Sequence, residues 1–226
     1  MRLRRMIVPL LVVMPLLAIL IGFGTWQVQR LQWKTALLAD IAAAEALPAR
    51  PLNPGAPPPA WMRVAATGRF DHGREALLGL EVRGPILGAR LLAPLLRDGA
   101  PPLLVDRGWV PIDRTGAIAR PEGPVTVEGY IRPGDRPNPF SANDDTAGRR
   151  FYTFDPPAIG AALGLPGVEP FGLVAMGAGP GLPDPARVLP RPTNSHLGYV
   201  ITWYGLALSL LGVFIAWMRR RLKDQP

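Results

Sequence analysis

Two long runs of apolar residues lie at opposite ends of the chain. Residues 6–23 form a run of 18 uncharged residues, and residues 197–218 form a run of 22. A helix of about 20 apolar residues spans the hydrocarbon core of a bilayer. Pro9 and Pro15 fall inside the first run, but membrane helices tolerate proline better than soluble helices do. The pattern therefore predicts two transmembrane helices, at 6–25 and 196–218, with short tails at 1–5 and 219–226.

The helical pattern continues beyond the first run. Trp26, Arg30 and Trp33 follow at i, i+4 and i+7, and apolar residues at 37, 38 and 41 prolong the stripe. We therefore expect a helical extension over 26–47 that ends before Pro48. Residues 48–60 are rich in proline, which favours an extended linker.

Between residues 61 and 178 the pattern changes to short apolar segments bounded by glycine, proline and aspartate, which is typical of antiparallel strands. Strands are expected within 61–70, 75–84, 88–96, 101–112, 125–132, 151–155 and 168–176. A loop is expected at 134–150, a short helix at 157–165 and a Pro/Gly-rich return linker at 179–195. The predicted fold class is membrane-anchored α+β, with two transmembrane helices flanking a mainly antiparallel β extracytoplasmic domain that has one or two short helices.

Charge predicts the orientation of the two spans. The formal net charge is +8, and six of these charges lie on the two short tails. The positive-inside rule places both tails in the cytoplasm and the main domain on the outer face. The high isoelectric point thus reflects membrane topology, and no nucleic-acid partner is expected. A cleaved signal peptide would have a shorter apolar stretch with a small-residue site close behind it, and no presequence typical of mitochondrial import precedes the first run. We expect a multi-pass protein of the bacterial inner (plasma) membrane, with a periplasmic main domain.

Few residues in this chain are suited to catalysis. It has no cysteine, two histidines and three serines, and no serine lies in a nucleophile-elbow pattern. A zinc or copper site is not expected, since its usual ligands are so scarce. The chain is predicted not to be an enzyme. A chain-length regulator of surface polysaccharide also has terminal spans, but its middle is a long helix rather than short strands.

Two polar and aromatic motifs lie where the spans meet the expected outer surface. The first, residues 24–34, reads GTWQVQRLQWK, and the second, residues 194–204, reads NSHLGYVITWY. Interfacial anchoring explains such aromatic and basic residues taken singly. His196, Tyr199 and Trp203, however, share one helical face, and a histidine there, opposite Arg30 and Lys34, can ligate a haem iron while the cations meet its propionates. On the residues alone, both interpretations stay open.

A third motif, Val105 to Pro111, reads VDRGWVP within an expected strand. Strict alternation would place Val105, Arg107 and Trp109 on one face. Gly108 is interpreted as a bulge and Pro111 as the strand end. Arg107 can pair with an aspartate, Asp106 or Asp113, or contact a partner protein.

Together these motifs resemble the surfeit locus protein 1 family, to which the yeast protein Shy1 belongs. The resemblance covers nearly the whole chain. It rests on Gly24, Trp26, Gln27, Arg30, Leu31, Trp33 and Lys34; on Gly68 and Phe70; on Leu104 to Pro111; on Val127, Glu128 and Gly129; on Phe140, Asn143, Asp144, Phe151 and Asp155; and on Asn194, His196, Leu197, Tyr199, Thr202 and Trp203.

The resemblance implies an assembly factor for aa3-type haem-copper cytochrome c oxidase that binds haem a and assists its insertion into subunit I. It implies His196 as the axial ligand, with Tyr199, Trp203, Arg30 and Lys34 around the haem and no other metal site. Trp26, Gln27, Trp33, Arg107, Gly108, Trp109 and Pro111 are expected in partner contacts or structural roles. The implied partners are subunit I, haem a synthase and membrane lipid. A scaffold that stabilises a subunit I intermediate without binding haem is the alternative.

Overall fold

The computed structural model describes residues 2–53, 55, 57–136, 139, 141–178 and 180–223. Phe140, one of the residues that carry the family resemblance, lies outside these ranges. The chain divides into two compact units, which are described separately: residues 1–40 with 191–226, and residues 41–190.

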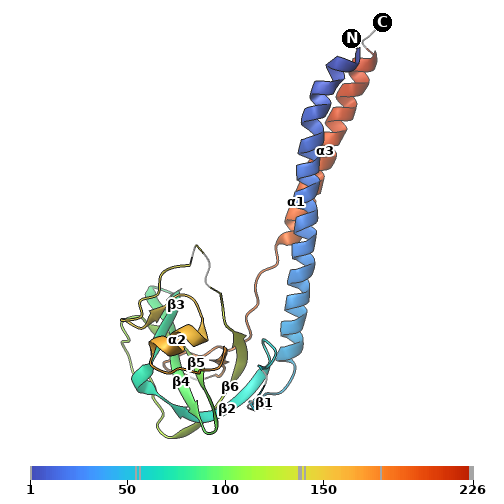
Figure 1. Ribbon diagram of the computed structural model, residues 1–226. Helices are drawn as coiled ribbons and strands as arrows, with labels where there is room; N and C mark the ends of the chain where they lie inside the picture. Colours follow the sequence, from blue (N-terminus) through green and yellow to red (C-terminus); the bar gives the residue numbers. More distant parts are fainter. Residues whose placement is uncertain are drawn as a thin grey trace. The chain divides into compact units, whose positions relative to one another are not determined.

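The first unit is a pair of antiparallel helices, α1 (Arg2–Glu45) and α3 (His196–Lys223), which run side by side (Figure 1). α1 continues without interruption through the expected span and its extension, with Pro9 and Pro15 inside it. Both helices are long and apolar enough to cross a membrane, and few of their apolar residues are buried. These two terminal helices indicate a membrane-anchored protein.

The second unit is built on one eight-stranded sheet (Figure 1). Its strands are β1 (Arg50–Pro51), β2 (Arg63–Phe70), β3 (Ala76–Arg83), β4 (Ile86–Arg97), β5 (Ala100–Pro111), β6 (Pro124–Pro133), β7 (Arg150–Phe151) and β8 (Phe171–Ala175), with a short 3₁₀ turn η1 (His72–Arg74) and helix α2 (Pro156–Ala162). The strand order is β1-β2-β6-β8-β5-β4-β3-β7. β1–β2, β3–β7 and β5–β8 are parallel pairs, and the other pairs are antiparallel.

An additional pairing of β2 with β4 closes part of this sheet into a small barrel made of β2, β6, β8, β5 and β4. Gly68 of β2 lies at the closure. A Cβ atom at Gly68 would be 2.4 Å from the Leu96 carbonyl oxygen, so only glycine lets the two strands approach. Every barrel strand contributes to the buried interior, which contains Val64, Ala66, Leu95, Leu103, Val105, Ile131, Phe171 and Leu173.

A second apolar layer lies between the sheet and α2. Leu78, Leu92 and Leu104 of the sheet pack there against Phe154 and Ile159. α2 begins where expected because the Asp155 side chain accepts a hydrogen bond from the Ala158 N–H, and prolines occupy the first helical positions.

The predicted fold class is confirmed: terminal apolar helices flank a mainly sheet domain. Residues 152–155, expected to be part of a strand, instead lead from β7 into the cap of α2. The compact unit, residues 41–190, is wider than the expected domain and includes all of the expected linker at 48–60 and part of the one at 179–195. β1 pairs with β2, and Asp184 exchanges two backbone hydrogen bonds with Trp109, so both segments are held by the sheet.

Candidate functional site

A polar contact joins the two terminal helices. His196, the first residue of α3, places its Nδ1 atom 2.7 Å from Oε1 of Gln27 on α1. Gln27 is only 8% exposed. An amide oxygen can only accept a hydrogen bond, so Nδ1 of His196 carries the hydrogen. In the neutral ring, Nε2 therefore keeps its lone pair, and the imidazole is oriented as a ligand with its outer partner in place.

Aromatic packing surrounds this contact. Trp203 stacks on Phe23 of α1, with ring centroids 4.9 Å apart. Next to them, the Tyr204 ring lies over Gly24, where a Cβ atom would be 2.9 Å from the ring. The indole Nε1 of Trp203 is buried and has no hydrogen-bond partner among the described residues. The helix pair therefore contains an aromatic contact between Phe23 and Trp203, and the indole N–H of Trp203, seven residues after His196, is a buried donor without a partner among the described residues.

The predicted cations lie in a separate cluster on α1. The Arg30 guanidinium lies 5.7 Å from the Trp26 ring centroid and 5.5 Å from that of Trp33, and the Lys34 ammonium lies 5.8 Å from Trp33. Trp26 and Trp33 are 47% and 54% exposed. Successive helical residues point about 100° apart, so Trp26 and buried Gln27 face different directions.

The structure thus brings together only part of the predicted site. His196 and Trp203 both contact α1, whereas Tyr199, on the same face of α3, is 54% exposed. Within the described part of the chain, no hydrogen bond, ion pair or ring contact joins Arg30 or Lys34 to His196. Sequence reasoning placed Gln27 in the motif but missed its bond to His196. Its polar side chain near the end of an apolar run was the available signal.

The VDRGWVP motif lies in β5 and contains the expected bulge. Asp106 pairs with Leu92 and Gly108 with Leu91, so Arg107 is the extra residue, and the strand ends at Pro111 as predicted. The bulge reverses the alternation beyond it. Trp109 therefore shares a face with Asp106, and the expected common face of Val105, Arg107 and Trp109 is wrong.

Arg107 pairs with neither of the two expected aspartates. Its Nη1 atom lies 3.4 Å from Oε1 of Glu75, while Asp106 pairs with Arg90 at 3.0 Å. Asp113 instead accepts hydrogen bonds from Thr115. The bulge turns Arg107 toward the residue next to η1 and leaves Asp106 to the neighbouring strand.

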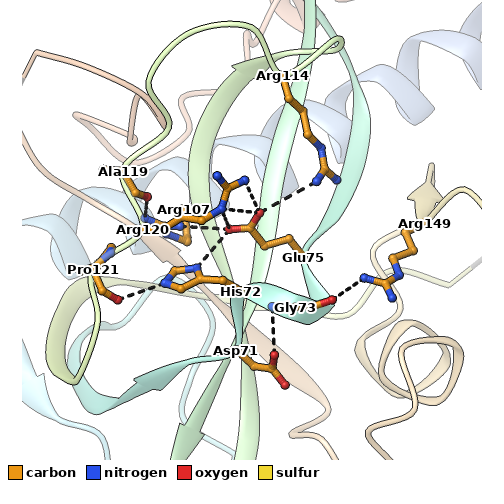
Figure 2. A network of polar contacts seen from close by, with 10 residues as sticks. All are labelled: Asp71, His72, Gly73, Glu75, Arg107, Arg114, Ala119, Arg120, Pro121 and Arg149. Atoms are coloured by element: carbon orange, nitrogen blue, oxygen red, sulfur yellow. Dashed lines mark hydrogen bonds and ion pairs between the residues drawn. The ribbon is translucent and has the colours of Figure 1, made fainter.

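The buried Glu75 carboxylate is the centre of a polar cluster, which we call the Glu75 cluster: Glu75, His72, Arg107, Arg114 and Arg120 (Figure 2). Glu75 is 3% exposed, and Arg120 donates to both of its oxygens, at 3.2 and 2.8 Å. Burial raises the pKa of Glu75, but hydrogen bonds from Arg120 and His72 and the charges of Arg120 and Arg107 outweigh it, so that the pKa lies below its ordinary value. The carboxylate is therefore ionised in the folded domain.

Sequence reasoning missed every member of this cluster except Arg107. His72 and Glu75 are i, i+3 neighbours at η1, whereas Arg114 and Arg120 lie in the connection between β5 and β6. The spacing of His72 and Glu75 is local, but no local spacing links this pair to the arginines, because the sheet brings the two segments together.

The chain therefore belongs to a class of membrane-anchored proteins. Its two terminal helices are long enough to cross a bilayer and are joined by a histidine–amide contact, and the residues between them form a small β-barrel domain. Among the described residues, no group of three or more histidine, aspartate and glutamate side chains is arranged to hold a metal ion. The chain belongs to the SURF1 family, whose model matches residues 14–208. This confirms the resemblance read from the motifs. The family is one of cytochrome c oxidase assembly factors and is not a named enzyme family.

Curated relatives resemble the chain over most of their length. Surfeit locus protein 1 of Takifugu rubripes is 28% identical, covering 89% of this chain and 93% of the relative. The human protein of the same name is also 28% identical, over 91% and 75%. A SURF1-like protein of the bacterium Rickettsia conorii is 27% identical, over 89% and 88%. The similarity therefore includes the terminal helices as well as the barrel domain.

Proposed function

We propose that this assembly factor binds haem a through His196 and assists its insertion into subunit I of an aa3-type cytochrome c oxidase. The observation that carries the proposal is the 2.7 Å contact between Gln27 and His196. In the neutral form of the ring, this contact leaves the Nε2 lone pair free for a metal, and the Gln27 carboxamide oxygen takes the place of the oxygen acceptor to which ligating histidines commonly donate their other N–H. Haem iron accepts such an axial nitrogen ligand.

The surroundings of His196 suit the other parts of haem a. The helix pair leaves its apolar side chains outward, a surface compatible with lipid and with the isoprenoid tail of haem a. The propionates need donors or cations. Arg30 and Lys34 of α1 carry charges at the same end of the span, and the spare Trp203 Nε1 adds a buried donor. A single axial histidine would allow the haem to be released to subunit I, with haem a synthase as the supplier.

We also propose the orientation of the protein: both tails lie in the cytoplasm and the barrel domain lies on the periplasmic side of a bacterial inner membrane. The basic residues at 2, 4 and 5 and at 219–221 support it. The natural chain has no cysteine. A single cysteine introduced at Thr115 should therefore react with a membrane-impermeant maleimide in intact spheroplasts, and one at Lys223 should react only after lysis. The reverse pattern would refute the orientation.

The scaffold alternative depends on a different surface of α1. The exposed Trp26–Arg30–Trp33 stack offers an aromatic and cationic surface that can contact a subunit I intermediate without any haem. If this is the function, replacing Trp26 and Trp33 lowers oxidase levels while His196→Ala does not.

An absorption spectrum of the purified full-length protein, from cells that make haem a, tests the proposal. The wild type is expected to show bound haem a, and His196→Ala is expected to show none. Gln27→Leu should reduce haem occupancy by about tenfold or more, because the ring loses its orienting partner. His72→Gln is the matched control, since His72 is the second of the two histidines and lies in the Glu75 cluster. Absence of haem from the wild type, or its retention by His196→Ala, would refute the carrier mechanism.

A further inference from the structure

A cavity of about 790 Å³ lies beside the Glu75 cluster in the barrel domain. Arg107 and Arg120 line it, and the other lining residues are small or apolar. They include Ala117, Ala119, Leu182, Pro183 and Pro185. The volume lies within the range of small-molecule sites, roughly 300–1,000 Å³. The cavity therefore combines a cationic end with an apolar body.

Among the described residues, the guanidiniums at the cationic end outnumber the carboxylates paired with them. Three guanidiniums, of Arg107, Arg114 and Arg120, converge on the single carboxylate of Glu75 (Figure 2). Arg107 is 8% exposed, and its pKa is lowered by burial and by the neighbouring Arg120 charge, against the opposing effect of Glu75. Burial and the Arg120 charge both disfavour the charged form of Arg107, whereas Glu75 favours it. A second anion would relieve the repulsion between the two cations.

Donors also remain unused at this end. Arg120 directs Nε and Nη2 to Glu75, and its Nη1 atom makes no hydrogen bond within the described ranges. Arg107 directs Nη2 to the Ala119 carbonyl oxygen at 2.6 Å and makes only a long contact, 3.4 Å, with Glu75. A planar guanidinium matches the two oxygens of a carboxylate or phosphate. The free donors and the surplus charge thus point to the same kind of ligand.

We propose that this cavity binds a small amphiphilic oxyanion, with its carboxylate or phosphate head at Arg107 and Arg120 and its apolar body against Leu182 and the neighbouring prolines. This site is independent of His196, and its occupant is distinct from the proposed haem cargo. The bulge in β5 makes the site possible, because Arg107 is its extra residue and lies among the residues that line the cavity.

Calorimetric titration of the full-length protein in phosphatidylcholine nanodiscs tests the site, with empty nanodiscs as the blank. Hexanoate and butyl phosphate are expected to bind saturably. Hexanamide, a neutral isostere of hexanoate, should bind at least about tenfold more weakly, because it cannot form charge-assisted hydrogen bonds with guanidinium. This comparison uses the wild type alone and does not depend on a variant that folds. Equal binding of hexanoate and hexanamide, or no saturable binding of either anion, would overturn the proposal.

Variants locate the site. Arg120→Gln should weaken hexanoate binding by about tenfold or more, and Ala117→Trp should block it without changing any charge. Arg136→Gln is the matched control, since Arg136 is exposed and does not line the cavity. Loss of affinity in Arg136→Gln equal to that in Arg120→Gln would refute the location. Inorganic phosphate that binds as tightly as butyl phosphate would show an adventitious ion only.

A final arm distinguishes the source of the ligand. Nanodiscs that contain phosphatidic acid should lower the apparent affinity for hexanoate if a lipid headgroup is the natural occupant. Unchanged affinity would indicate a water-soluble acid. Both results support the oxyanion site, and they differ only in where the oxyanion comes from.

Discussion

Replacing Gly108 by alanine should destabilise the barrel domain strongly, and the structure allows the size of the effect to be worked out. Gly108 has φ +133°, a conformation that residues with a side chain rarely adopt. A Cβ atom there would lie 2.3 Å from the carbonyl oxygen of Asp184 and 2.8 Å from the nitrogen of Pro185. Both are backbone atoms, so a flexible side chain cannot move away to make room.

The cost has two parts. Forcing a side chain into this backbone region costs about 1–3 kcal/mol. The segment at Asp184 must also move away, which breaks its two hydrogen bonds with the backbone of Trp109, at 2.8 and 2.9 Å. Each is worth about 1 kcal/mol. We therefore expect Gly108→Ala to lower the free energy of unfolding by about 3–5 kcal/mol, a large share of the stability of a typical domain.

Urea denaturation of the full-length protein, together with amide hydrogen exchange, measures this effect. The amides of Trp109 and Asp184 should lose protection in Gly108→Ala before the rest of the sheet does. Gly99→Ala is the matched control: Gly99 also has a positive φ, +68°, but nothing lies within 4 Å of the added Cβ atom. It should cost only about 1 kcal/mol. Equal losses in the two variants, or unchanged protection at Asp184, would refute the reasoning.

Two further predictions concern buried charges in the domain. Glu75→Gln should cost about 3 kcal/mol at neutral pH, because it leaves the buried Arg107 guanidinium without its carboxylate partner. Arg120 and His72 hold the folded-state pKa of Glu75 below its ordinary value. The difference in unfolding free energy between the variant and the wild type should therefore be full above about pH 5 and become smaller as the pH falls below about 4. A difference that does not change with pH in urea titrations would contradict this prediction. Arg97→Met should cost about 3–5 kcal/mol, because it removes the 2.5 Å partner of the nearly buried Glu169 carboxylate. Adding Glu169→Leu should restore part of this loss, and a double-mutant cycle without coupling would disprove the pairing.

Local patterns alone were sufficient for much of this molecule. The two terminal helices follow from the length of their uncharged runs, since no other element needs about 20 successive apolar residues. The strands from β2 to β6 follow from short apolar segments between glycine and proline breaks, and a short helix was expected at 157–165, close to α2. The bulge at Gly108 and the strand end at Pro111 were readable from residue type. Membership of the SURF1 family followed from the order of motifs along nearly the whole chain.

Only the tertiary structure decided which residues meet. Gln27 and His196 are 169 residues apart, and Arg107 and Glu75 are 32 apart, so no local spacing could have paired them. Closure of the barrel through β2 and β4 depends on long-range strand pairing, which periodicity does not encode. The bulge adds one residue to β5 and reverses the faces beyond it, so a simple alternation rule assigned Trp109 to the wrong face. Backbone conformation is dictated by neighbouring residues, whereas contacts between distant segments depend on how the whole chain buries its apolar surface.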